Sequence, residues 1–154
     1  MLPLVQTTLL WFLALGCGLM AGLYYAFSAV IMTSLSRIAP EAGIATMVSI
    51  NDVILKTSFM PLFMGTSLGS VVIGILAVVR WQGSDSLVIL LGALVYVVGM
   101  FGVTAAFNVP LNNALVADGA GTWARYLTDW TLWNHVRTAA SLIASALFIY
   151  ALAQ

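Results

Sequence analysis

The chain has 154 residues, of which 62% are hydrophobic and 6% are charged. Soluble domains carry about a quarter charged residues, so the composition excludes an ordinary soluble domain and predicts an integral membrane protein. Five basic and five acidic residues give a net charge of zero, and the basic surface that a nucleic-acid partner requires is therefore missing. The single cysteine, Cys17, excludes an internal disulfide and a cysteine-based zinc site.

Four apolar stretches are each long enough to cross a bilayer, which takes roughly 20 helical residues. In chain order they cover about residues 4–32, 59–79, 87–107 and 134–153. The sequence therefore predicts an all-α, four-transmembrane-helix bundle made by a single domain over residues 1–154. Residues 33–58 and 108–133 form two long connections, and each is predicted to hold an additional amphipathic helix. Residues 80–86 form a tight turn.

An even number of spans puts both termini on one face of the membrane and both long connections on the other. The long connections and the start of the last span carry four of the five basic residues: Arg37, Lys56, Arg125 and Arg137. Because basic residues concentrate on the cytoplasmic side, both termini are predicted to be non-cytoplasmic in a multi-pass protein of the cell membrane. The bilayer is thus the first expected partner.

Small residues line the first span, and Gly18 and Gly22 form a GxxxG pair. Such a surface lets helix backbones approach closely. It predicts tight packing inside the bundle, and it leaves a homo-oligomer open as an alternative use of the same residues.

Two asparagines, Asn108 and Asn112, flank Pro110 in the sequence FNVPLNNAL. Proline has no backbone N–H and disfavours helix for the residue before it, so the third helix is predicted to break there. A break at membrane depth survives only where it is buried in protein or faces a water-filled cavity. The asparagines either satisfy the freed backbone groups or point their amide donors into a pocket.

A polar and aromatic stripe is predicted along the last helical segment. Trp123, Trp130, Asn134 and Arg137 have helical spacing, and Asn51 lies on the same membrane face. The tryptophans are also typical of residues that anchor a helix at the membrane interface. That reading does not explain Asn134 and Arg137, because an arginine inside the bilayer is costly unless it is paired or reaches the interface. The Arg137 guanidinium is expected at, or just inside, the membrane boundary.

His135 is the only histidine, so a multi-histidine metal site is excluded and no metal is predicted. Its imidazole is chemically suited to carry a proton near neutral pH. However, its place in the helix is rotated away from the stripe, as is that of Asp129, the other candidate base. The sequence does not choose between these two groups.

Several motifs together resemble one family. GLMAGLYYAFSAVIM, SIND, FNVPLNNAL and YLTDWTLWNHVRTAASL are similar to the anthrone oxygenase-like family of small four-helix membrane proteins, over nearly the whole chain. The resemblance implies a monooxygenase, an oxidoreductase that converts anthrones to anthraquinones with O2 and without a recognised cofactor. The residues that match the patterned positions are Asn51, Asn108, Pro110, Asn112, Trp130, Asn134 and Arg137.

Two functions therefore compete. In the first, a lipophilic anthrone- or hydroquinone-like substrate is oxidised, and donors stabilise its oxyanion. The catalytic candidates are then Asn108, Asn112, Asn134, Arg137 and His135, and the candidates for substrate binding are Asn51, Trp123 and Trp130. In the second, the same groups bind a lipid or another small molecule without catalysis, for storage or transport.

Overall fold

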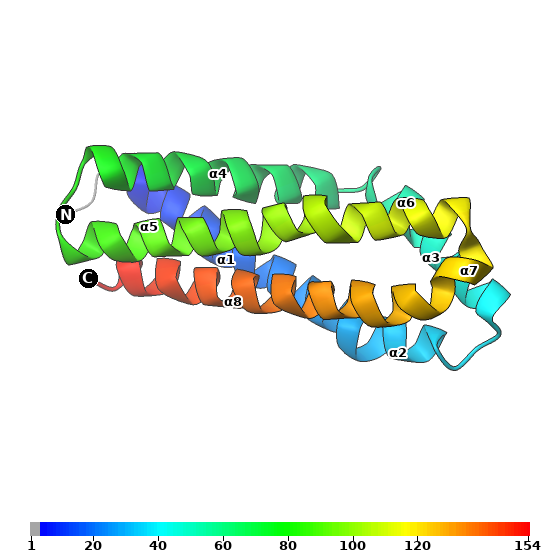
Figure 1. Cartoon of the computed structure of the whole chain (residues 1–154). Coiled ribbons are helices and arrows are strands. Elements are labelled where there is room, and N and C mark those ends of the chain that lie inside the picture. Colours follow the sequence, from blue (N-terminus) through cyan, green and yellow to red (C-terminus); the bar gives the residue numbers. More distant parts are fainter. Residues whose placement is uncertain (1–3) are drawn as a thin grey trace.

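The computed structural model describes residues 4–154, and in this range the chain forms a bundle of four long helices (Figure 1). The four are long and apolar enough to cross a membrane: Leu4–Leu35, Phe59–Val79, Ser84–Ala117 and Gly119–Leu152. This confirms the predicted all-α bundle with four candidate spans. The start of the first long helix, the end of the fourth and the α4–α5 turn lie at one end of the bundle, and α3 lies at the other (Figure 1).

Three of the four helices change from α- to π-helical geometry along their length. The first contains α1 (Leu4–Ala26), a π-helical turn (Phe27–Ile31) and α2 (Met32–Leu35). The third contains α5 (Ser84–Tyr96), two π-helical turns (Val97–Gly102 and Thr104–Asn108) and α6 (Val109–Ala117). The fourth contains α7 (Gly119–Arg125), a π-helical turn (Tyr126–Trp130) and α8 (Thr131–Leu152).

The two long connections differ from each other. The first holds a separate helix, α3 (Pro40–Ile54), which begins with a proline, as helices favour in their first turn. The second connection holds no separate helix in the described structure. The third helix continues to Ala117 and the fourth begins at Gly119, so only Asp118, with φ −144° and ψ 67°, separates them. An amphipathic role for α3 stays a prediction.

The predicted break at Pro110 is wrong, because the third helix passes through this residue. Pro110 occupies the first turn of α6, directly after the π-helical turn Thr104–Asn108. A first helical turn tolerates proline since its N–H groups have no intrahelical partner. Because the π-helical turn ends at Asn108, Pro110 stands in the first turn of a new α-helical segment although the helix as a whole is not interrupted.

Helix length indicates where the membrane lies. A 34-residue helix such as Gly119–Leu152 is about 50 Å long, well beyond the roughly 30 Å of a hydrocarbon layer. The 21-residue α4 (Phe59–Val79) matches that thickness, so Phe59 is expected near one membrane boundary. The part of the bundle around α3 then extends past the hydrocarbon on that side.

The half of the bundle near the α4–α5 turn is packed through small residues. A Cβ atom at Gly92 would lie 2.9 Å from the ring of Phe148, and one at Gly99 would lie 2.6 Å from the Cβ of Ala140. Close helix contact is thus present here at glycines outside the predicted pair. At that pair, a Cβ atom on Gly18 would lie 3.3 Å from Ser145 Oγ and one on Gly22 would meet nothing within 4 Å. Fully buried apolar side chains fill the remaining space: Leu10, Leu13, Met20, Ile73 and Phe148.

Candidate functional site

The other half of the bundle holds a partly open cavity of about 660 Å³ between α1, α3, α4, α6 and the part of the fourth helix from Trp130 to Arg137. This is the size range of pockets that bind small organic molecules. The walls are largely apolar, and Leu23, Phe27, Phe59 and Phe63 are among them. The polar or charged groups in the lining, tyrosine aside, are Asn51, Asp52, Thr104, Asn112, Asn113 and Arg137.

Arg137, on α8, is the buried charge of this cavity, with 5% of its surface exposed. Its Nη2 donates a hydrogen bond to Asn134 Oδ1 at 2.6 Å, and its Nη1 donates to Thr104 Oγ1 at 3.4 Å. Its Nε is buried without a partner. The guanidinium carbon lies 4.3 Å from the ring centre of Tyr24 and 5.2 Å from that of Trp130. Two aromatic rings thus flank a cation whose hydrogen-bonding capacity is only partly used.

No carboxylate neutralises Arg137 within residues 4–154. The ion pairs formed there are Lys56 with Asp52 at 2.7 Å and Arg125 with Asp129 at 3.0 Å, and all four side chains are substantially exposed. A buried charge without a partner is costly. Aromatic faces recover part of that cost. The remainder makes the Arg137 end of the cavity favourable for an anion or for an oxygen on which negative charge develops.

Asn134 holds the arginine in place and does not line the cavity. It is fully buried, and its Nδ2 donates to the backbone oxygen of Tyr24 and to Ser28 Oγ, each at 2.6 Å. Because its Nδ2 donates to the first helix and its Oδ1 accepts from Arg137, the Asn134 amide fixes the guanidinium relative to α1. We therefore assign Asn134 a positioning contact.

Asn108 likewise binds backbone and does not line the cavity. Its Nδ2 donates to the backbone oxygen of Trp130 at 3.2 Å, where the π-helical turn of the fourth helix ends. This carbonyl belongs to the neighbouring helix, so Asn108 neither satisfies the backbone groups freed at Pro110 nor points its amide donor into the cavity. The buried Asn108 Oδ1 has no partner in the described structure.

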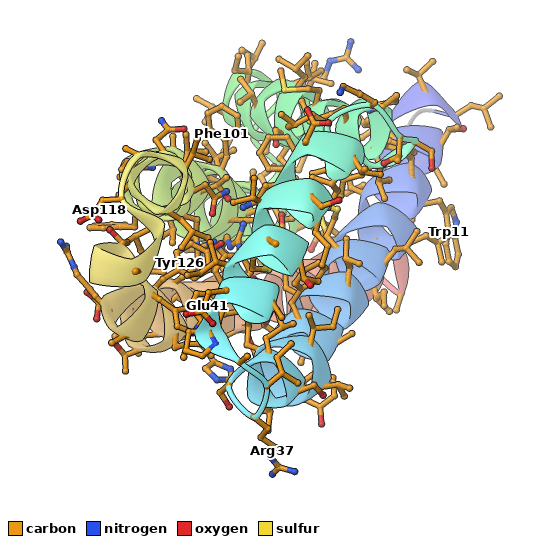
Figure 2. The ribbon with its side chains drawn as sticks, turned by 90° about the vertical axis from the view of Figure 1, so that its right-hand side faces the viewer. Trp11, Arg37, Glu41, Phe101, Asp118 and Tyr126 are labelled. Atoms are coloured by element: carbon orange, nitrogen blue, oxygen red, sulfur yellow. The ribbon has the colours of Figure 1, made fainter. Side chains whose placement is uncertain are left out.

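A second polar group of the cavity centres on Tyr126, which faces α3 (Figure 2). The Tyr126 hydroxyl donates to Asn112 Oδ1 at 2.8 Å and accepts a hydrogen bond from Asn51 Nδ2 at 3.4 Å. These contacts join α3, α6 and the fourth helix. Asn51 and Asn112 both line the cavity, so this cluster offers a second set of polar contacts besides Arg137.

The two predicted tryptophans have different positions. Trp130 lines the cavity and stacks on Tyr126 with the ring centres 5.7 Å apart. Trp123 is buried behind Tyr126, away from the cavity lining, and packs against α3, where a Cβ atom at Gly43 would lie 2.6 Å from its ring. Trp123 therefore holds α3 on the bundle.

The candidate bases lie outside the cavity. His135 is exposed, and Asp129 is ion-paired with Arg125; neither belongs to the lining. Asp52 is the one carboxylate among the described lining residues, and its oxygens bind Lys56 Nζ at 2.7 and 2.9 Å. Within residues 4–154, no group of three or more His, Cys, Asp or Glu side chains is arranged to hold a metal ion.

Sequence reasoning missed Tyr24, Thr104, Asp52 and Tyr126 as members of the site. Tyr126 was recoverable, because it lies three residues after Trp123 and four before Trp130, on the same helical stripe. Tyr24 lies in the stretch GLYYAF. Its contact with Arg137 depends on how the first and fourth helices pack. No local pattern signals that contact.

Comparison with known protein families matches the part of the chain that holds most of the candidate site residues. A sequence model of the anthrone oxygenase family matches residues 53–147, more than half of the chain. The match includes Asn108, Asn112, Trp130, Asn134 and Arg137, while Tyr24 and Asn51 precede it. No curated protein and no solved structure matches the chain.

Proposed function

The chain belongs to the anthrone oxygenase family, and from this premise we propose that it is a membrane-embedded oxygenase that oxidises a lipophilic aromatic substrate with O2. One observation carries the proposal. Among residues 4–154 no carboxylate pairs with the buried cation Arg137, which is flanked by aromatic rings and faces a largely apolar cavity. This arrangement suits a flat apolar molecule that gains negative charge on one oxygen as it reacts.

An anthrone has this property. It carries a ketone and, across the same ring, a CH2 group whose proton is acidic because the anion places its charge on the ketone oxygen. Loss of one proton gives that anion, and transfer of one electron to O2 gives a radical pair that joins as a peroxide at the same carbon. Loss of the second C–H proton then breaks the O–O bond. One oxygen atom becomes the new carbonyl and the other leaves as water, so four electrons pass from the carbon to O2.

Arg137 would stabilise the oxyanion in the first step. Its donors are fixed in advance by Asn134 and Thr104, and fixed donors in a site that excludes water lower the barrier most. Removal of one such donor typically costs about 10²–10³ in rate. Tyr24 and Trp130 would contact the face of the substrate rings, an arrangement that aromatic groups favour.

Asp52 is our candidate for the base. It lines the cavity from α3, and its side chain is 65% exposed, so a proton that it accepts has a direct path to water. Neither His135 nor Asp129 has a comparable position. The Asn51–Tyr126–Asn112 cluster would orient the substrate by contacts to a second oxygen substituent.

The alternative is a protein that binds a lipid or small molecule without catalysis. The same unpaired guanidinium supports it, because a planar arginine fork binds carboxylate and phosphate groups well. The alternative does not require Asp52 in the lining. Family membership favours the oxygenase.

The test is oxygen uptake by the purified, chelator-treated protein in bilayer discs with anthrone as substrate. The proposal expects uptake above the uncatalysed rate, one O2 consumed per anthraquinone formed, and one atom from labelled O2 in the new carbonyl. Binding of anthraquinone without any uptake above background would overturn the oxygenase and favour the binding protein.

A further inference from the structure

A second hollow adjoins the cavity on the outside of the bundle. It has a volume of about 510 Å³ and runs between α1 and α4. Leu23, Ile54 and Phe59 line both spaces. The two spaces are therefore adjacent, and only these side chains stand between the cavity and the groove.

The groove arises because α1 and α4 separate toward the α3 end. At Gly16 the helices are in close contact, and a Cβ atom there would lie 2.6 Å from Thr66 Cγ2. Gly22 lines the groove nearer the α3 end, on another face of α1, and a Cβ atom there would meet nothing within 4 Å. Figure 1 shows α1 crossing the bundle obliquely and leaving α4 in this direction. Figure 2 shows α3 lying across the opened end between them.

The lining of the groove is graded in polarity. Thr57 and Ser58, in the connection before α4, lie at one end, and apolar side chains such as Leu19 and Leu62 form the remainder. Because Phe59 is expected near a membrane boundary, the groove leads from that boundary into the hydrocarbon layer. Its lining is largely apolar, which suits a hydrocarbon chain better than a polar group.

We propose that this groove binds an aliphatic chain of the same substrate whose aromatic head lies in the Arg137 cavity. The substrate class is then an amphiphile: a flat, oxygenated aromatic head that carries an alkyl or prenyl chain and enters sideways from the bilayer. This inference rests on the proposed function for the identity of the head. The groove itself rests on the separation of α1 and α4 and on the walls shared with the cavity.

Gly22 gives a specific test. It lines the groove but not the cavity, and it has free space where a side chain would go. Gly22→Leu therefore fills the groove without forcing a backbone shift. Ala146→Leu is the matched control, because Ala146 is exposed on α8, away from both hollows. The ligands are anthraquinone and 2-dodecylanthraquinone, and binding in discs of one lipid composition is read from quenching of tryptophan fluorescence.

In the wild type and in Ala146→Leu, 2-dodecylanthraquinone is expected to bind at least about tenfold more tightly than anthraquinone. In Gly22→Leu the difference should be less than about threefold, as for a pocket that discriminates by size. Equal affinities for the two ligands in the wild type would overturn the proposal. The proposal would also be overturned if Gly22→Leu still bound 2-dodecylanthraquinone at least about tenfold more tightly than anthraquinone.

Oxygen uptake with anthrone and 2-dodecylanthrone separates this proposal from the proposed function. If neither compound is oxidised but Gly22→Leu removes the chain advantage in binding, the oxygenase fails and the groove stands. If both are oxidised and the chain gives no advantage, the groove fails and the oxygenase stands.

Discussion

The two halves of the bundle use the same helices for different purposes. The half near the α4–α5 turn is regular α-helix and packs through Gly74, Gly92 and their neighbours. All the π-helical turns of the described chain lie toward the α3 half, where the cavity is. Single π-helical turns frequently occur at functional sites. The difference is what the proposed function requires, since it separates the closely packed part of the fold from the part that holds the cavity.

Buried polar groups follow the same division. In the packed half they are mainly hydroxyls, and Thr66 and Ser67 donate to carbonyls of their own helix. In the cavity half they are amides and a guanidinium, and Asn134 and Asn108 donate to carbonyls of other helices. Some hydroxyls of the packed half also join helices, as Ser145 Oγ does by donating to the backbone oxygen of Ala14, but around the cavity amide side chains make these contacts.

The largest expected effect on rate is at the mouth of the cavity. Asp52→Asn removes the proposed base and should lower kcat for anthrone oxidation by about 10²–10⁴, the usual worth of a general base. Asp129→Asn is the control, because this carboxylate is ion-paired outside the cavity and should leave kcat within about twofold. Equal losses in both variants would remove Asp52 from the mechanism.

The next effect concerns stability and the packed half. Phe148→Ala should lower the free energy of unfolding in detergent by about 3 kcal/mol, because lost packing contacts leave a cavity beside Gly92. The control Ile149→Ala changes a neighbouring exposed side chain, and a change of less than about 1 kcal/mol is expected. Activity per folded molecule should not change in either variant. A fall in kcat with Phe148→Ala would show that the two halves are coupled.

A smaller effect is expected at the second polar group of the cavity. Tyr126→Phe removes the hydroxyl that joins Asn51 and Asn112, and should weaken binding of anthraquinone by about three- to tenfold, the worth of one hydrogen bond. Tyr96→Phe removes a buried hydroxyl that contacts Thr66 in the packed half, and should lower stability without a change in affinity. The reverse pattern would contradict the division of the bundle.

The smallest effect is expected at His135. The side chain is exposed and lies outside the cavity lining, so His135→Gln should leave kcat/KM within about twofold, as for an ordinary surface substitution. A larger loss across the pH range in which histidine titrates would restore its candidacy as the proton carrier.

The sequence predicted the bundle because apolar length and the scarcity of charge dictate it. It also placed Trp130, Asn134 and Arg137 on one face, since helical spacing decides that without tertiary information. It was wrong at Pro110, because a π-helical turn carries the helix through the proline, and no residue pattern marks such a turn. Partners that come from other helices, such as Tyr24 beside Arg137, depend on packing and could not be predicted locally.

The proposed role of Arg137 is to stabilise an oxyanion in the cavity, and two arginine variants of one helix distinguish this role from a general effect of charge. Arg137→Met and Arg125→Met each remove one positive charge from the same long helix, the first buried at the cavity and the second exposed and ion-paired. Oxygen uptake with anthrone should fall by about 10²–10³ in Arg137→Met. It should stay within about twofold in Arg125→Met, because exposed ion pairs contribute little. An Arg137→Met protein that stays folded and consumes oxygen at the wild-type rate would contradict the account.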